Sequence, residues 1–358
     1  MKIGLLTTYS FNYGSFHQAV ALQKKLQDMG YECELINEKI KKYRWFNLFC
    51  MYTADPILPE CVKNYIGKIL PQYNSYRMIN NDIKKLVVSP AYIKSIRKLS
   101  QRYDLVIVGS DELWSADCSS IRYCPEYFGH GWKCPLISYA TCAVKLDISN
   151  RDLCDKIRLG LQKFVAISVR DELSKDNISK VIRNKNVEVV LDPTLLNPYF
   201  INKTIKKSPQ KYILLYGQHY DEEQKQIILQ MSSEEKAIIY SVGWAHDWSD
   251  KFVNVKSADE LQDMFSGAFF CFPSTFHGTI FSILNHKQFV SMLNPLRGKK
   301  VQILLNELRL QERIYKKGMD ISKMEDIDFN RVENRLNELR RNSQAYLDHA
   351  LRKVETKV

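Results

Sequence analysis

The sequence has no long hydrophobic run. Across its 358 residues, no uninterrupted apolar stretch approaches the length of roughly 20 residues that a membrane-spanning helix needs. The apolar run within residues 1–8 is too short for a signal peptide and is typical of a first buried strand. We therefore expect a cytoplasmic protein.

Glycine-rich phosphate-binding fingerprints are also missing. Among the 14 glycines there is neither a G-x-G-x-x-G segment nor a Walker loop. This argues against a dinucleotide-dependent enzyme and against a P-loop nucleotidase.

Close cysteine pairs are absent as well. Cys118, Cys124, Cys134 and Cys142 cluster, but they lie six, ten and eight residues apart, without the C-x₂-C pairs of familiar zinc sites. A zinc site there is the less favoured alternative to buried, reduced cysteines. We therefore expect neither a metal nor a cofactor.

The charge is strongly basic but not concentrated. The chain carries 52 Lys and Arg against 40 Asp and Glu, a formal net charge of +12. Such a surplus favours anionic partners such as phosphorylated substrates or an acidic membrane surface. Because the basic residues are spread along the chain and no nucleic-acid motif accompanies them, we expect no nucleic-acid partner.

Strand and helix patterns alternate twice along the chain. Apolar runs of strand length alternate with helical spacing, which predicts an α/β fold of two domains that face each other across a cleft. The expected domains are residues 1–200, with a helical insertion at about 40–100, and residues 209–320. A charged amphipathic helix within 321–358 is expected to pack across both domains.

The sharpest local signal is the stretch 269–284. An apolar run ends at Ser274 and Thr275, and His277-Gly278 then opens a helical pattern. Because ligands of α/β sheets bind at the carboxyl ends of strands, His277 stands where an anionic substrate and a titratable group could meet. The alternative, weighed equally, is a polar loop whose histidine caps the helix.

Other predicted strands end in polar residues too. Asn12 and Gly14 follow the first strand, and Ser110, Asp111 and Glu112 follow the aliphatic run 105–108. Arg170 follows another strand, and arginine suits carboxylate or phosphate recognition. The alternatives are that Asp111 caps a helix and that Arg170 pairs with Asp171 or another acid.

Six motifs in order resemble one known family. They are Asn12-x-Gly14, Gly109-Ser110-Asp111-Glu112-Leu113-Trp114, Ser138-Tyr139-Ala140, Ser168-Val169-Arg170-Asp171-Glu172-x-Ser174, Asp192-Pro193-Thr194 and Ser274-Thr275-Phe276-His277-Gly278. Together they resemble the polysaccharide pyruvyl transferase family, from residue 1 to about 313. The resemblance implies two facing Rossmann-like domains of GT-B-like architecture, and transfer of the enolpyruvyl group of phosphoenolpyruvate to sugar hydroxyls as a ketal.

The resemblance also implies roles for individual residues. His277 resembles the family's proposed catalytic histidine, and Arg170 resembles its donor-binding arginine. Arg297 takes the place of a lysine twenty residues beyond the histidine, and Thr275 that of an arginine in some relatives. We expect His277, Arg170 and Arg297 to be catalytic. The expected donor-binding set is Arg170, Ser274, Thr275, His277, Gly278 and Arg297, and the acceptor-binding set is Asn12, Gly14, Ser110, Asp111 and Glu112.

The implied chemistry suits these residue types. Phosphoenolpyruvate carries a phosphate and a carboxylate, which cationic side chains bind. Histidine has an ordinary pKa of about 6.5 and can supply or accept a proton. The acceptor would be a free or lipid-linked sugar in surface-polysaccharide or capsule assembly, and the basic surplus fits peripheral association with the inner membrane face. The sequence does not indicate an oligomeric state.

Two other functions stay open at this point. One is a GT-B glycosyltransferase with a nucleotide-sugar donor. The other is an inactive carbohydrate-binding relative, which the departures at Thr275 and Arg297 would allow.

Overall fold

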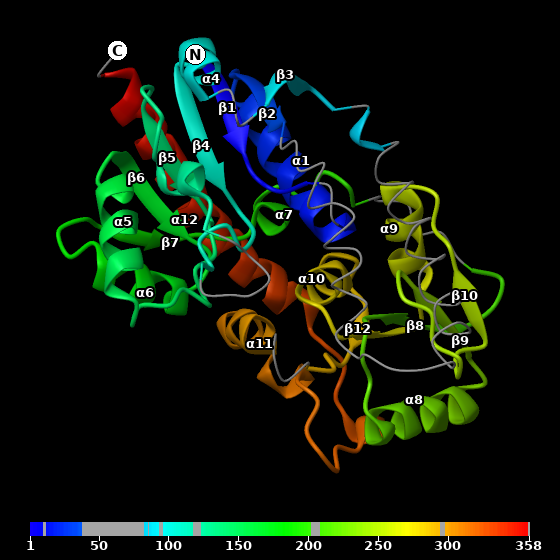
Figure 1. The fold of residues 1–358 in the computed structure, drawn as a ribbon. Helices are drawn as coiled ribbons and strands as arrows, with labels where there is room; N and C mark the ends of the chain where they lie inside the picture. Colours follow the sequence, from blue (N-terminus) through cyan, green and yellow to red (C-terminus); the bar gives the residue numbers. More distant parts are fainter. Residues whose placement is uncertain are drawn as a thin grey trace, which may run out of the picture.

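Two parallel β-sheets organise the protein. The structure is a computed structural model, and it describes residues 1–9, 12–37, 82–84, 86–92, 96–116, 123–201, 208–293 and 298–356. Within them, one sheet belongs to the first half of the chain and the other to the second half. The sheets lie in separate layers with helices between them (Figure 1). The predicted α/β fold is confirmed.

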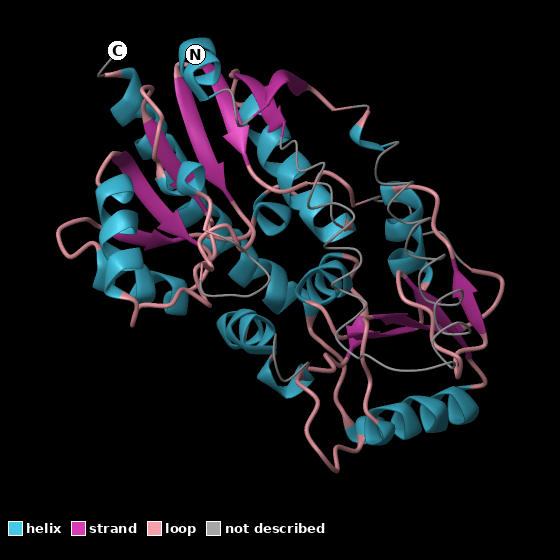
Figure 2. Ribbon diagram, viewed as in Figure 1, coloured by secondary structure: helices cyan, strands magenta, loops and turns pink. Residues whose placement is uncertain are grey.

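The amino-terminal sheet has seven strands, all parallel. Their spatial order is β3 (Val88–Tyr92), β2 (Glu32–Asn37), β1 (Lys2–Leu6), β4 (Leu105–Gly109), β5 (Leu136–Tyr139), β6 (Phe164–Val169) and β7 (Val187–Val189). The central strand β4 is buried along its whole length, as its aliphatic run predicts. Figure 2 shows these strands as one twisted sheet.

Helices cover both faces of this sheet. One face packs against α1 (Tyr13–Asp28) and against α12 (Phe329–Glu355). The opposite face packs against the elements α4 (Ile96–Arg102), η2 (Pro125–Phe128), α5 (Arg151–Leu161) and α6 (Glu172–Val181). Burial on both faces explains why the strands are almost continuously apolar.

The carboxyl-terminal sheet has five parallel strands. Their order is β10 (Lys251–Val253), β9 (Ile238–Val242), β8 (Tyr212–Tyr216), β11 (Phe270–Pro273) and β12 (Gln288–Phe289). The accompanying helices are α8 (Glu222–Glu235), α9 (Ala258–Gly267), α10 (Phe276–Leu284) and α11 (Gly298–Glu307), followed by η3 (Gln311–Arg313) and η4 (Ile321–Lys323).

The two halves pack against each other. Side chains of α1, including Phe16, share one apolar cluster with Phe281 of α10 and Phe265 of α9. The short helix α7 (Pro193–Leu196) contacts both α1 and α12. Figure 1 shows α1 and α10 facing each other between the sheets. The ends of the strands are therefore brought together across this interface.

The helix α12 runs across the protein as predicted. Its first turns join the carboxyl-terminal cluster through Val332 and Leu336, and its later turns join the amino-terminal sheet through Leu347 and Leu351. Both chain ends lie at the same end of the amino-terminal half in Figure 1. Across the described residues, no helix combines the length and apolar character needed to cross a membrane.

The structure differs from the sequence analysis at the sheet edges. Residues Val88–Tyr92 form strand β3 rather than part of a helical insertion at about 40–100. Pro90 argues against a strand in the sequence, because proline has no N–H to donate within a sheet. It is tolerated here because β3 is an edge strand, where one side has no neighbouring strand. The rest of that insertion lies largely outside the described residues. The three-residue strand β10 was also not expected.

Candidate functional site

The candidate site lies where strand ends of both halves meet. Thr275 rather than His277 caps α10, since its Oγ1 accepts a hydrogen bond from the N–H of Gly278 at 3.0 Å. His277 is the second residue of the helix and keeps its imidazole free of a capping role. Its side chain is 14% exposed and turns toward the amino-terminal half.

Asp192 joins two of the three predicted catalytic residues, Arg170 and His277. Its Oδ2 accepts a hydrogen bond from Nη1 of Arg170 at 3.1 Å and lies 3.7 Å from Nε2 of His277. The carboxylate is 1% exposed. Burial alone would raise its pKa, but His277 and then Arg170 outweigh this effect and hold the pKa of Asp192 well below its usual range.

Arg170 is buried at the end of β6. Its Cζ lies 4.4 Å from the ring centroid of Phe276, a cation–π contact across the two halves. Nε of Arg170 has no hydrogen-bond partner among the described residues. Arg170 pairs with Asp192, whereas Asp171 caps α6 through the N–H of Ser174 at 2.8 Å.

Asn12 and Gly14 shape the other wall. The side-chain oxygen of Asn12 caps α1 by accepting from the N–H of Ser15 at 2.9 Å. Gly14 lies directly against His277: a Cβ at position 14 would be 2.4 Å from Nδ1. The glycine is therefore needed for close approach of the imidazole to α1.

Strained residues follow β4 and β5. Ser110, Asp111 and Ala140 have φ values of 38°, 72° and 52°, in the left-handed region that side chains other than glycine seldom adopt. Asp111 accepts from Oγ1 of Thr8 at 2.7 Å, and Oγ of Ser110 is buried with no hydrogen-bond partner among the described residues. Such strain gathers at functional sites, so this edge is a candidate ligand surface.

An ion pair links the halves beside this edge. Lys300 of α11 donates to Oε1 of Glu112, which follows β4. Burial opposes ionisation of Glu112, but Lys300 first, then Lys145 and Arg170, outweigh it and lower the pKa of this carboxyl to about 2. Glu112 is therefore ionised at neutral pH.

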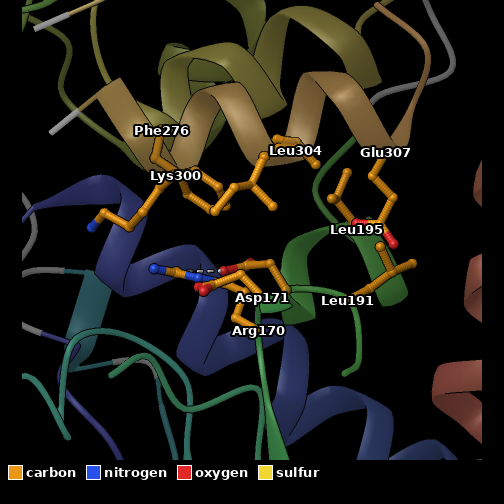
Figure 3. A pocket seen from close by; sticks show the side chains of 10 residues that line it. Arg170, Asp171, Leu191, Leu195, Phe276, Lys300, Leu304 and Glu307 are labelled. Carbon is orange, nitrogen blue, oxygen red and sulfur yellow. Dashed lines mark hydrogen bonds and ion pairs between the residues drawn. The ribbon is translucent and has the colours of Figure 1, made fainter. Parts of the chain in front are cut away.

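A small pocket lies between α11 and the ends of β6 and β7. Its lining residues are Arg170, Asp171, Leu191, Asp192, Leu195, Phe276, Lys300, Ile303, Leu304 and Glu307, and Figure 3 shows them facing one another across the domain interface. The cavity volume is about 20 Å³, enough for a water molecule but not for an organic phosphate. An organic phosphate therefore does not fit the pocket in this arrangement of its lining residues.

A second histidine lies nearby but is structural. His17 is fully buried, with Nδ1 3.1 Å from the hydroxyl of Tyr199 and Nε2 3.4 Å from Nε2 of Gln262. Burial, and secondarily the charge of His277, lower the pKa of His17 to about 3. It stays neutral and packs the two halves together.

The remaining predicted donor-binding residues are Ser274 and Gly278, which the structure describes, and Arg297, which it does not. Oγ of Ser274 would lie 1.7 Å from a Cβ built at Gly217, so these two strand ends touch. Gly278 allows the ring of Tyr216 to approach closely. Arg297 and Cys118 lie outside the described residues. Within the part of the chain that the structure describes, no three His, Cys, Asp or Glu side chains gather as metal ligands.

The match to a family covers most of the chain. Residues 12–295, which contain Gly14, Arg170, Asp192 and His277, match polysaccharide pyruvyl transferase. The chain belongs to this family. Membership makes the protein a transferase. No curated protein matches the chain in sequence.

Solved structures show the same fold at low identity. An alpha-glucosyltransferase in complex with UDP and DNA is 9% identical, with a TM-score of 0.50 over 99% of this chain and 94% of its own. A UDP-GlcNAc 2-epimerase from Methanocaldococcus jannaschii is 10% identical, with a TM-score of 0.46 over 95% and 99%. At such identity the likeness to the glucosyltransferase shows the fold alone, the GT-B-like arrangement that the resemblance implied.

Sequence reasoning left two residues of this pyruvyl transferase site without a role. Asp192 and Phe276 were parts of family motifs but received no role, whereas Lys300 was one of three cations, with Lys299 and Arg297, named as replacements for the arginine absent at position 275. The signal for Asp192 was its place at a strand end, the same signal that selected Arg170. Lys300 and Phe276 lie on helices, and only the packing of the two halves brings them to the site.

Proposed function

We propose that this protein transfers the enolpyruvyl group of phosphoenolpyruvate to two hydroxyls of a sugar residue, as a ketal, in surface-polysaccharide biosynthesis. The observation that carries the proposal is the convergence of Arg170 and His277, from different halves of the chain, on one oxygen of Asp192. A permanently charged anion-binding group and a proton-transfer group thus meet at the domain interface of a family member.

The two described cations of the pocket are already paired, so a phosphoenolpyruvate donor must compete with their carboxylate partners. Arg170 is paired with Asp192 and Lys300 with Glu112, so both described cations of the pocket already have carboxylate partners. When α11 moves, the donor phosphate would replace Glu112 as the partner of Lys300, because charge-assisted hydrogen bonds to phosphate are strong. Arg170 would keep Nε, which has no hydrogen-bond partner among the described residues, for the donor carboxylate. Arg297 would add a further cation.

The acceptor is assigned to the amino-terminal half. The strained Ser110 and Asp111 offer hydroxyl and carboxylate groups at the ends of the strands, as sugar hydroxyls require. A lipid-linked sugar at the inner membrane face would suit the basic charge of the chain.

Phosphate release tests the proposal. Wild-type protein is incubated with phosphoenolpyruvate and an extract of lipid-linked oligosaccharides, beside His277→Ala and a matched control, His349→Ala, whose histidine is exposed on α12. We expect acceptor-dependent release by the wild type and the control, and a loss of at least about 100-fold in His277→Ala. Absence of release together with tight binding of a nucleoside diphosphate would favour a glycosyltransferase. Acceptor binding with no turnover of either donor would favour an inactive relative.

A further inference from the structure

The two oxygens of Asp192 have separate partners. Oδ1 accepts from the backbone N–H of Thr194 at 3.0 Å and from its hydroxyl at 2.6 Å. Oδ2 accepts from Arg170 and faces His277. Because Asp192 also begins α7, the backbone fixes the carboxylate from one side and leaves the other side to the two proposed functional groups.

The two nitrogens of His277 also have separate surroundings. Nε2 is buried, has no hydrogen-bond partner among the described residues, and lies 3.7 Å from Oδ2 of Asp192. Nδ1 lies beside Gly14 of α1, since a Cβ at position 14 would be 2.4 Å from it. The hydrogen bond of one ring nitrogen sets which nitrogen carries the proton in a neutral imidazole.

We propose that Asp192 is the positioning residue of this site: it directs Nε2–H of His277 toward its own Oδ2 and leaves Nδ1 to exchange protons with the substrate. The role in proton exchange rests on the proposed function, whereas the orientation of the ring does not. The distance of 3.7 Å becomes a hydrogen bond when it shortens by less than 1 Å, and such bonds commonly tighten once substrate binds.

The proton transfers balance with Nδ1 as the active nitrogen. Nδ1–H of the imidazolium gives its proton to the methylene carbon of phosphoenolpyruvate, which becomes a methyl group. The first sugar hydroxyl then bonds to C2, and its proton passes to Nδ1. The C–O bond to phosphate breaks, the second hydroxyl bonds to C2, and its proton leaves with the phosphate. Nε2–H faces Asp192 throughout, so one anion stabilises the charged ring and fixes its orientation.

Asp192→Asn tests this role sharply. Thr194 donates two hydrogen bonds to Oδ1 and Arg170 donates one to Oδ2. The oxygen of the new amide is therefore favoured on the side of Thr194, and its NH₂ then faces His277 and Arg170. An NH₂ group there favours a lone pair on Nε2. We therefore expect the neutral ring to change from Nε2–H to Nδ1–H, and kcat for phosphate release to fall about 100-fold while the KM for phosphoenolpyruvate changes much less.

The tautomer is read directly by ¹⁵N NMR of histidine-labelled protein at pH 8, where histidines are ordinarily neutral. The signals of His277 are assigned by their loss in His277→Ala. The matched control is Asp221→Asn, since Asp221 caps α8 through the N–H of Gln224 far from the site, and it should keep both tautomer and kcat.

Three results would overturn the proposal. They are Nδ1–H as the tautomer of the wild type, an unchanged tautomer in Asp192→Asn, and wild-type kcat in that variant. The first needs no variant, so it decides the matter even where Asp192→Asn does not fold. A wild-type protein that shows the Nε2–H tautomer but never releases phosphate would contradict the proposed function while leaving the orientation of the ring intact.

Discussion

Replacing Gly14 with alanine tests whether the first turn of α1 fixes the imidazole of His277, the proposed proton-transfer group. The new Cβ would lie 2.4 Å from Nδ1, 2.6 Å from Cγ and 2.9 Å from Cβ of His277. Ordinary contacts begin at 3.4 Å, so the ring must move by about 1 Å, the difference between 3.4 and 2.4 Å. That movement also changes its distance from Asp192.

The same substitution should affect stability much less than activity. A misplacement of about 1 Å in a reacting group can lower the rate about 100-fold. Overpacking lowers the free energy of unfolding by about 1–3 kcal/mol, while alanine in place of glycine favours a helix by up to about 1 kcal/mol. We expect a net loss of roughly 0–2 kcal/mol in the free energy of unfolding.

The assay measures kcat for phosphate release and the free energy of unfolding in urea. The matched control is Gly4→Ala, whose Cβ would lie 2.6 Å from the ring of Tyr103, inside the amino-terminal half and away from the site. We expect this control to lose about 1–3 kcal/mol of stability and to keep its kcat. A folded Gly14→Ala protein with kcat within twofold of wild type would refute the idea that α1 restrains His277.

Two further substitutions concern the ion pairs of the pocket. Arg170→Met leaves Asp192 buried without its guanidinium partner, so the free energy of unfolding in urea should fall by about 3–5 kcal/mol; a loss below about 1 kcal/mol would contradict this. Glu112→Gln removes a carboxyl whose pKa lies at about 2 in the folded protein and at 4.5 in the unfolded protein. This difference contributes about 3 kcal/mol to the free energy of unfolding at pH 7. Because the folded pKa is the lower one, this contribution is complete above about pH 4.5 and is lost as the pH falls toward 2, so the difference between variant and wild type should shrink across that window in urea titrations. Freeing Lys300 should also tighten phosphoenolpyruvate binding in calorimetry, and weaker binding would argue that Glu112 does not compete with the donor.

The sequence alone determined the local structure and most of the strand ends. Aliphatic runs such as Leu105–Val108 can only be buried strands, and the polar residues that follow them must lie at the ligand-binding edge of a parallel sheet. That reasoning reached Arg170, Asp111 and His277 without knowledge of any contact. The motifs also indicated the family, because their order along the chain is more specific than any one of them.

Only the tertiary structure decided which of these groups act together. Arg170 and Asp192 are 22 residues apart, and Lys300 and Glu112 are 188 apart, and nothing in local spacing pairs them. Arg170 meets Asp192 because β6 and β7 pair within one sheet. Lys300 meets Glu112 because the two halves pack, which follows from the shape of apolar surfaces on α1, α7 and α10. The orientation of the His277 ring is decided in the same way, by a carboxylate on one side and a glycine on the other. Local sequence specifies the elements, whereas the distances between side chains of different elements exist only once those elements have packed.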